Sequence, residues 1–343
     1  MTRDGLHIWR IILFTLLCIG IVVLAFADLL IGTTKVSIDE VWAALTGSCT
    51  NPQYEVIVYR MRLPKVLAAI VAGMALAASG LEMQTLFRNP LAGPYVLGIN
   101  AGASLGVAIF TLALPMLGMA SGGWLMRLGI TGMAWVGSAA ILLLVMVLSR
   151  HIKNINVILI LGMMLGSAIS AVVNILQYMG TDESLKAFIV WTMGSLLTVT
   201  LSDLEILIPV TVVGLILAIA AIKSLNMLLL GESYARTMGL RVGLSRSIIF
   251  LSTTLLAGGV TAFCGPIGFI GLAMPHLARM TFRTADHRIL MPGTILWGAF
   301  AMLVCCVVCD IMAHSDLLLP VNTVTSLLGV PIIIFVVFRN RNR

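Results

Sequence analysis

The chain has 343 residues, of which 60% are apolar and only 10% are charged. Soluble domains are about a quarter charged, so this composition excludes a disordered chain and argues against an ordinary soluble enzyme. The mean hydropathy of +1.09 indicates a membrane protein instead. A membrane-crossing helix needs roughly 20 apolar residues. Repeated spans would therefore use nearly the whole chain, and we expect a single transmembrane domain over residues 1–343.

Apolar runs recur along the chain and predict an all-α bundle of about ten transmembrane helices. In chain order the runs are 11–32, 66–87, 95–115, 128–149, 155–179, 204–223, 247–264, 267–282, 292–313 and 322–338. The long stretch 247–282 is divided at the Gly265-Pro266 pair, because glycine permits a tight turn and proline removes a backbone donor. The longest connection, at about 224–246, is predicted to be a loop between the sixth and seventh helices.

Positive charge sorts to one side of this arrangement. An even number of spans places both termini on the same side, and the connections on that side carry most of the 21 Lys and Arg residues. Cytoplasmic loops carry the excess of Lys and Arg, so both termini are expected in the cytoplasm. The same rule accounts for the net charge of +7 without a nucleic-acid partner.

Signatures of catalysis are missing from the sequence. It contains no GxxxxGK[ST] loop to cradle ATP phosphates and no HExxH metal-binding pair. We therefore predict no enzymatic activity, no metal site and no cofactor on this chain. Ion-driven carriers usually need ionisable groups within the membrane, and Glu82 is the clear candidate here. A single carboxylate is weak support for ion coupling, so the energy for uphill transport is expected to come from a partner.

Five segments together are specific for one family. They are RMRLPK at 60–65, MQTLFRNPLA at 83–92, GESYARTMGL at 231–240, GPIGFIGL at 265–272 and MPHLAR at 274–279. In their order and spacing they resemble the permease subunits of bacterial ABC importers for iron-siderophores, haem and vitamin B12, the type II importers. The resemblance covers essentially the whole chain.

The resemblance implies an assembly in the bacterial cytoplasmic membrane. It implies a homodimer with the pathway along its axis, and two cytoplasmic ATPase subunits that bind ATP and Mg²⁺. A periplasmic or lipid-anchored binding protein would deliver a metal-chelate or tetrapyrrole cargo. An iron-siderophore is favoured over haem and cobalamin. A stand-alone secondary transporter or channel is the alternative, but it leaves the segment at 231–240 unexplained.

The segment at 231–240 resembles the helix that couples such permeases to their ATPase. The predicted coupling residues are Gly231, Glu232, Ser233, Tyr234, Ala235, Arg236, Met238 and Gly239. A short helix over 232–238 would place Tyr234, Ala235 and Met238 on one side, as apolar contacts for a groove in the partner. The alternative is a surface loop that merely joins two helices.

A basic cluster lies on the predicted outer side, where Lys and Arg are normally scarce. In the family, basic residues at the positions of Arg62 and Lys65 meet acidic residues of the binding protein, and we include the neighbouring Arg60. Such charges steer and orient docking. The alternative is a helix-end anchor whose side chains snorkel towards water.

The fifth apolar run corresponds to the helix that lines the pathway in the family. The candidate pathway residues are Met163, Met164, Ser167, Ser170, Asn174 and Gln177, together with Glu82. The candidate inner gate consists of Asn154, Ile155 and Asn156. Polar groups on such a helix can equally face a neighbouring helix.

Two segments depart from the family pattern. His314 stands where related permeases often have arginine, and Asn322 stands where they usually have glycine. These differences alter the predicted outer surface and the adjacent wall of the pathway.

Overall fold

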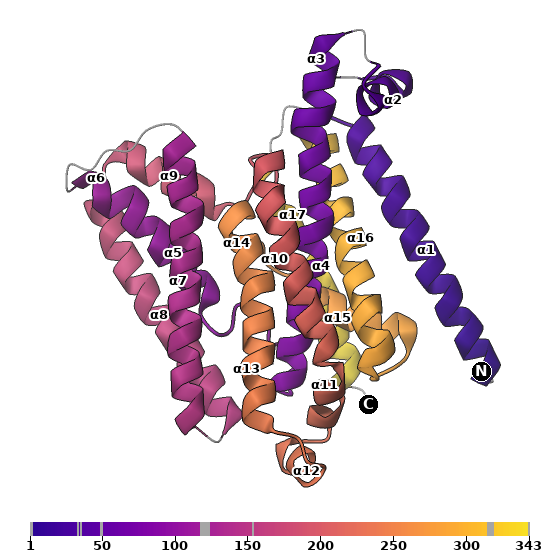
Figure 1. Ribbon diagram of the computed structural model, residues 1–343, viewed down its shortest axis with the longest axis vertical. Coiled ribbons are helices and arrows are strands. Elements are labelled where there is room, and N and C mark those ends of the chain that lie inside the picture. Colours follow the sequence, from indigo (N-terminus) through magenta and orange to yellow (C-terminus); the bar gives the residue numbers. More distant parts are fainter. Residues whose placement is uncertain are drawn as a thin grey trace. The chain divides into compact units, whose positions relative to one another are not determined.

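The computed structural model describes residues 3–32, 34, 36–48, 51–116, 124–152, 154–313 and 319–341. Every regular element within those ranges is a helix (Figure 1), which confirms the all-α prediction. The chain divides into two compact units. The first comprises Met1–Ala78, Ser195–Pro209 and Gly268–Arg343, and the second comprises Ser79–Gly194 and Val210–Ile267.

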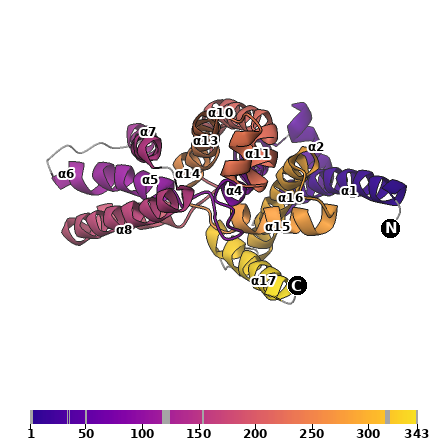
Figure 2. The same ribbon diagram turned by 90° about the horizontal axis from the view of Figure 1, so that it is seen from below.

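The first unit gathers helices from both ends of the chain. They are α1 (Arg3–Leu30), α2 (Ile38–Thr46), α3 (Pro52–Glu55), the π-helical η1 (Val56–Arg62), the beginning of α4 (Leu63–Leu86), the beginning of α10 (Leu201–Ala220), α15 (Ile270–Phe282), α16 (His287–Ala313) and α17 (Val321–Arg341). Within this unit α16 packs against α1, α15 and α17 (Figure 2).

The second unit holds the central part of the chain. It contains the ends of α4 and α10, α5 (Ile99–Ala108), the π-helical η2 (Ile109–Ala113), α6 (Leu114–Met116), α7 (Trp124–His151), α8 (Ile155–Met179), α9 (Asp182–Thr192), α11 (Ile222–Leu229), α12 (Glu232–Thr237), α13 (Val242–Thr253), the π-helical η3 (Thr254–Gly258) and α14 (Gly259–Cys264). Here α5 packs against both α7 and α8 (Figure 2).

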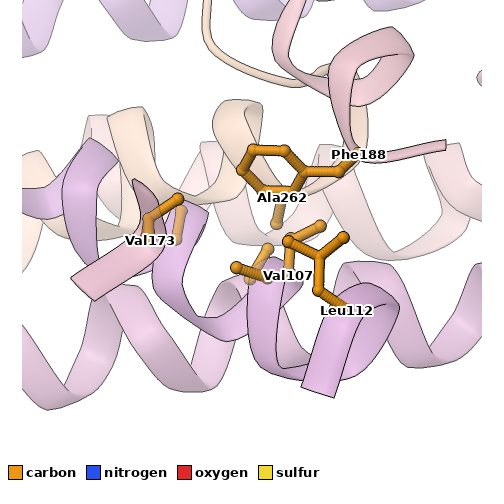
Figure 3. Packing of buried hydrophobic residues seen from close by; sticks show 8 residues of the cluster. Val107, Leu112, Val173, Phe188 and Ala262 are labelled. Carbon is orange, nitrogen blue, oxygen red and sulfur yellow. The ribbon is translucent and has the colours of Figure 1, made fainter. Parts of the chain in front are cut away.

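A cluster of buried apolar side chains joins six elements of the second unit (Figure 3). The ring of Phe188 lies over Ala262 and faces Val107 and Leu112, while Val173 closes the cluster from α8. Close contact of this kind is the main attraction between helices where lipid is as apolar as the side chains. The cluster therefore fixes α5, η2, α7, α8, α9 and α14 relative to one another.

All ten predicted apolar runs lie on helices. Within the described residues, seven helical stretches are long and apolar enough to cross a membrane, namely Gly5–Leu30, Pro52–Leu86, Gly129–Ser149, Ile155–Met179, Leu201–Ala220, Val242–Cys264 and His287–Ala313. Two shorter apolar stretches are Ile99–Ala113 and Val321–Phe335. The remaining predicted run coincides with α15, which has only 13 residues.

The predicted break in the stretch 247–282 is confirmed. Helix α14 ends at Cys264 and α15 begins at Ile270. Gly265 has φ of +72°, and a Cβ there would lie 2.5 Å from the carbonyl oxygen of Trp191. Both the backbone angle and the close approach require glycine.

The range 224–246 is not the loop that the sequence suggested. It is largely helical, because α11 reaches Leu229, α12 follows, and α13 already begins at Val242. Leu225 and Leu228 of α11 are buried. Burial of this apolar face stabilises α11. Hydropathy alone does not distinguish such a short helix from a loop.

Helices α4 and α16 cross at two glycines of the first unit. A Cβ on Gly298 would overlap the backbone carbonyl of Gly73, and it would lie 2.5 Å from the Cβ of Ala77. Because the obstructing atoms are largely backbone, rotation of a side chain would not relieve the overlap. The crossing therefore depends on the absence of side chains at both glycines.

We expect Gly298→Ala to destabilise the protein by about 1–3 kcal/mol, the usual cost of overpacking a close contact. Thermal unfolding of the purified chain in detergent measures the effect as a lower midpoint. Gly132→Ala is the matched control, since a Cβ at that helical glycine meets nothing within 4 Å. Equal midpoints for the two variants would show that α4 and α16 do not depend on this crossing.

Candidate functional site

A groove of about 630 Å³ runs along one face of α8 in the second unit. Four of the predicted pathway residues line it, namely Met163, Ser167, Ser170 and Asn174. Their spacing of four, three and four residues places them on a single helix face. The other wall comes from α5 and the segment before it, including Tyr95 and Asn100.

The polar groups of the groove differ in whether they are already paired. Ser167 Oγ donates to the Met163 carbonyl at 3.1 Å, and Ser170 Oγ donates to the Gly166 carbonyl at 2.9 Å. Asn100 Oδ1 is buried and has no hydrogen-bond partner among the described residues. Buried polar atoms are rarely left unpaired, so Asn100 is the groove residue best placed to bind a polar ligand atom or water.

Three other pathway candidates do not line this groove. Met164 is 61% exposed and Gln177 is half-buried. Glu82 is completely buried on α4 among residues of α13. Four of the seven candidates therefore share one groove, and a pathway role for all seven stays a prediction.

The candidate inner gate lies at the start of α8. Asn154 is the N-cap, and its side-chain oxygen accepts from the Asn156 backbone N–H at 3.0 Å. Asparagine is favoured at this position because it satisfies a backbone donor left free by the helix. Asn154 and Asn156 are exposed and Ile155 is half-buried. The cap explains one asparagine structurally, while gating stays a prediction.

The predicted coupling segment forms a short helix, α12, over Glu232–Thr237. Tyr234 is 54% exposed and Met238 is 48% exposed, and the preceding Leu230 is also exposed. Ala235 does not lie on the same side as Tyr234 and Met238, because it is completely buried inside the second unit. The exposed apolar surface near this helix therefore consists of Leu230, Tyr234 and Met238.

Arg246 attaches α12 to the rest of the second unit. Its Nε donates to Glu232 Oε1 at 2.9 Å, and its Nη1 donates to the Ile152 carbonyl at 3.2 Å. Ile152 lies two residues before the N-cap Asn154. A buried guanidinium thus joins α12 and α13 to the beginning of the groove-lining helix. Sequence analysis missed this link, since nothing local connects residue 246 with residue 152.

The predicted outer basic cluster is mostly internal. Arg60 is exposed, but Arg62 and Lys65 are buried. Arg62 Nη1 donates to the carbonyls of Leu29 and Leu30 at 2.7 and 3.1 Å. It therefore pairs backbone acceptors at the end of α1 that have no partner within that helix. Arg62 and Lys65 are therefore buried within the first unit, while their contact with a binding protein stays a prediction.

Lys65 forms a buried ion cluster with two carboxylates of the first unit. Its Nζ lies 3.0 Å from Asp28 Oδ1 of α1 and 2.5 Å from Asp310 Oδ2 of α16. The Asp28 side chain is completely buried. The ends of α1 and α16 and the beginning of α4 therefore meet at one ammonium group. Asp310 lies four residues before His314, which departs from the family pattern and lies outside the described residues.

The second departure, Asn322, has a structural role. Its Oδ1 accepts from the Gly268 backbone N–H at 2.9 Å. Asn322 thereby pairs a donor in the break that precedes α15. Glycine at this position could not make the same side-chain contact.

We expect Lys65→Met to destabilise the protein by about 3–5 kcal/mol, because it leaves two buried carboxylates without a cation. Thermal unfolding in detergent measures this effect, with the exposed Arg60→Met as control. If Lys65 served only to dock a partner, its loss would leave the unfolding midpoint unchanged.

Comparison with known proteins identifies a transport family with a similar sequence. The sequence pattern of the FecCD transport family matches residues 19–339. The hemin transport system permease protein HmuU of Yersinia pestis is 36% identical over 341 residues, which cover 95% of each chain. The vitamin B12 import system permease protein BtuC of Salmonella typhi is 36% identical over 302 residues, covering 88% of this chain and 89% of its own.

A solved structure agrees along nearly the whole chain. A metal-chelate type ABC transporter in an inward-facing conformation superposes with a TM-score of 0.82 at 30% identity. The match covers 96% of this chain and 99% of the other. The family resemblance predicted from five sequence segments is therefore confirmed: this chain belongs to the FecCD transport family of membrane permeases.

Proposed function

We propose that this chain is the membrane permease of an ABC importer for a metal chelate. The observation that carries the proposal is its similarity, nearly end to end, to permeases named for haem and vitamin B12. Both cargoes hold a metal in a tetrapyrrole macrocycle, which makes a cargo of that class the first to test. An iron-siderophore, a metal chelate without the macrocycle, is the second.

The proposed membrane arrangement has ten spans with both termini in the cytoplasm. Its support is a helix in every predicted run and the sorting of basic residues to one side. The shorter apolar helices would cross with the help of their neighbours, since burial in protein relaxes the length that lipid contact demands. The location would be the bacterial cytoplasmic membrane.

The proposed energy source is a pair of separate ATPase subunits that bind ATP and Mg²⁺. The sequence lacks the GxxxxGK[ST] loop needed to hold nucleotide phosphates. Helix α12 would supply the contact, because Tyr234 and Met238 present apolar surface at helical spacing. Such side chains bind by entering a groove of the partner.

A homodimer would complete the pathway. Helix α8 exposes apolar side chains beside the groove, including Ile160, Met164 and Ile175. A second copy of α8 could cover this face and enclose the groove between subunits. A periplasmic or lipid-anchored binding protein would deliver the cargo, and of the predicted docking residues Arg60 retains an exposed charge.

Replacing both exposed side chains, as Tyr234→Ser and Met238→Ser together, is expected to weaken binding of the ATPase subunit. Buried apolar contacts of this kind contribute about 2 kcal/mol each, so the affinity should fall at least tenfold. Binding of the purified ATPase subunit to the reconstituted permease measures it. Trp42→Ser removes an aromatic side chain that is 61% exposed on α2 and serves as control. An unchanged affinity would refute the proposed role of α12.

Arg246→Met is expected to separate ATP hydrolysis from transport. The variant loses the contacts of Arg246 with Glu232 and the Ile152 carbonyl, but it keeps Tyr234 and Met238 for docking. The assembled complex should hydrolyse ATP while cargo uptake falls at least tenfold. Arg241→Met, at an exposed neighbouring arginine, is the control. Unimpaired uptake by the Arg246 variant would show that the contacts of Arg246 do not couple ATP hydrolysis to transport.

A further inference from the structure

Glu82 has surroundings that the proposed transport function does not explain. Its side chain is completely buried. Its Oε2 lies 2.9 Å from Ser252 Oγ and 3.2 Å from Thr253 Oγ1, both on α13. Ser252 Oγ also lies 3.0 Å from the carbonyl oxygen of Gly214 on α10. All of these residues belong to the second unit.

The hydrogens in this cluster can be counted. A carbonyl oxygen and an ionised carboxylate both only accept hydrogen bonds. Ser252 Oγ carries one hydrogen, yet it lies within hydrogen-bond distance of two such acceptors. If Glu82 is ionised, one of the two contacts has no hydrogen. If Glu82 is protonated, Glu82 donates to Ser252 Oγ, and Ser252 donates to the Gly214 carbonyl.

The surroundings of Glu82 also favour its protonated form. In the described part of the chain the hydroxyls of Ser252 and Thr253 lie within hydrogen-bond distance of this carboxyl, and Glu82 takes part in none of the ion pairs found there. Burying an isolated carboxylate is so costly that the group neutralises instead. Asp28 and Asp310 show the contrasting case, since both are paired with Lys65.

We propose that Glu82 is a proton-binding site, a neutral carboxylic acid at pH 7 whose proton completes a hydrogen-bonded chain from α4 through Ser252 of α13 to the Gly214 carbonyl of α10. Loss of this proton would leave two acceptors competing for one hydroxyl hydrogen. Deprotonation would therefore loosen the contact of α4 with α13. The inference does not depend on the identity of the cargo or on the ATPase.

Infrared spectroscopy of the purified full-length chain tests the protonation state directly. Every other glutamate of the chain is at least partly exposed to solvent, whereas Glu82 is completely buried. We expect a carbonyl band of a protonated acid at pH 7 that shifts when all glutamates carry ¹³C at the carboxyl. The wild-type protein alone gives this answer. Absence of a label-sensitive acid band would overturn the proposal.

Variants then assign the band and test the chain of hydrogen bonds. Glu82→Gln should abolish the band and keep a near-wild-type unfolding midpoint, because an amide also has one accepting oxygen and a donating group. Glu82→Ala should unfold at a lower temperature, and Ser252→Ala should shift the frequency of the band. A band that survives in Glu82→Gln, or a Gln variant as unstable as the Ala variant, would contradict a neutral donor at this position.

Discussion

The ammonium group of Lys65 is the interaction on which the first unit depends. It lies within ion-pair distance of both Asp28 of α1 and Asp310 of α16 at the beginning of α4. Removing ions from water costs several kcal/mol each, and only close pairing with further hydrogen bonds offsets this cost. Arg62, one turn earlier, pairs the carbonyls at the end of α1. Together with Asp28 and Asp310, Lys65 and Arg62 therefore fix the ends of α1 and α16 and the beginning of α4.

Around Glu82 the second unit meets the same constraint with hydroxyl groups, while its buried Arg246 is paired with Glu232. Glu82 lies among hydroxyls, and serine hydroxyls on α8 bond to carbonyls of their own helix. Asn100 Oδ1 is the exception in the groove, since it is buried without a hydrogen-bond partner in the described part of the chain. Buried polar atoms are rarely left unpaired, so this atom is a place for a ligand or water to bind. The groove along α8 is thus chemically distinct from the packed helices around it.

The sequence predicted what depends on local composition. Hydropathy located a helix in every apolar run, and the Gly265-Pro266 pair located the break between α14 and α15. The alignment of four candidate pathway residues on one face of α8 follows from their helical spacing. The partners of Lys65 were not predictable, because Asp310 lies 245 residues away and a basic residue beside a span is as compatible with water as with a buried carboxylate. The orientation of Ala235 was missed because a six-residue helix shows too little periodicity to define its buried side.

Transport of cargo into sealed vesicles tests the central claim most directly. The chain would be reconstituted with its ATPase subunit and binding protein, with ATP and Mg²⁺ on the ATPase side. Haem, cobalamin and a ferric siderophore would be offered separately on the opposite side. The account predicts that one of these metal chelates accumulates only when ATP is hydrolysed. Accumulation driven by a proton or sodium gradient without the ATPase would contradict it and indicate a secondary transporter.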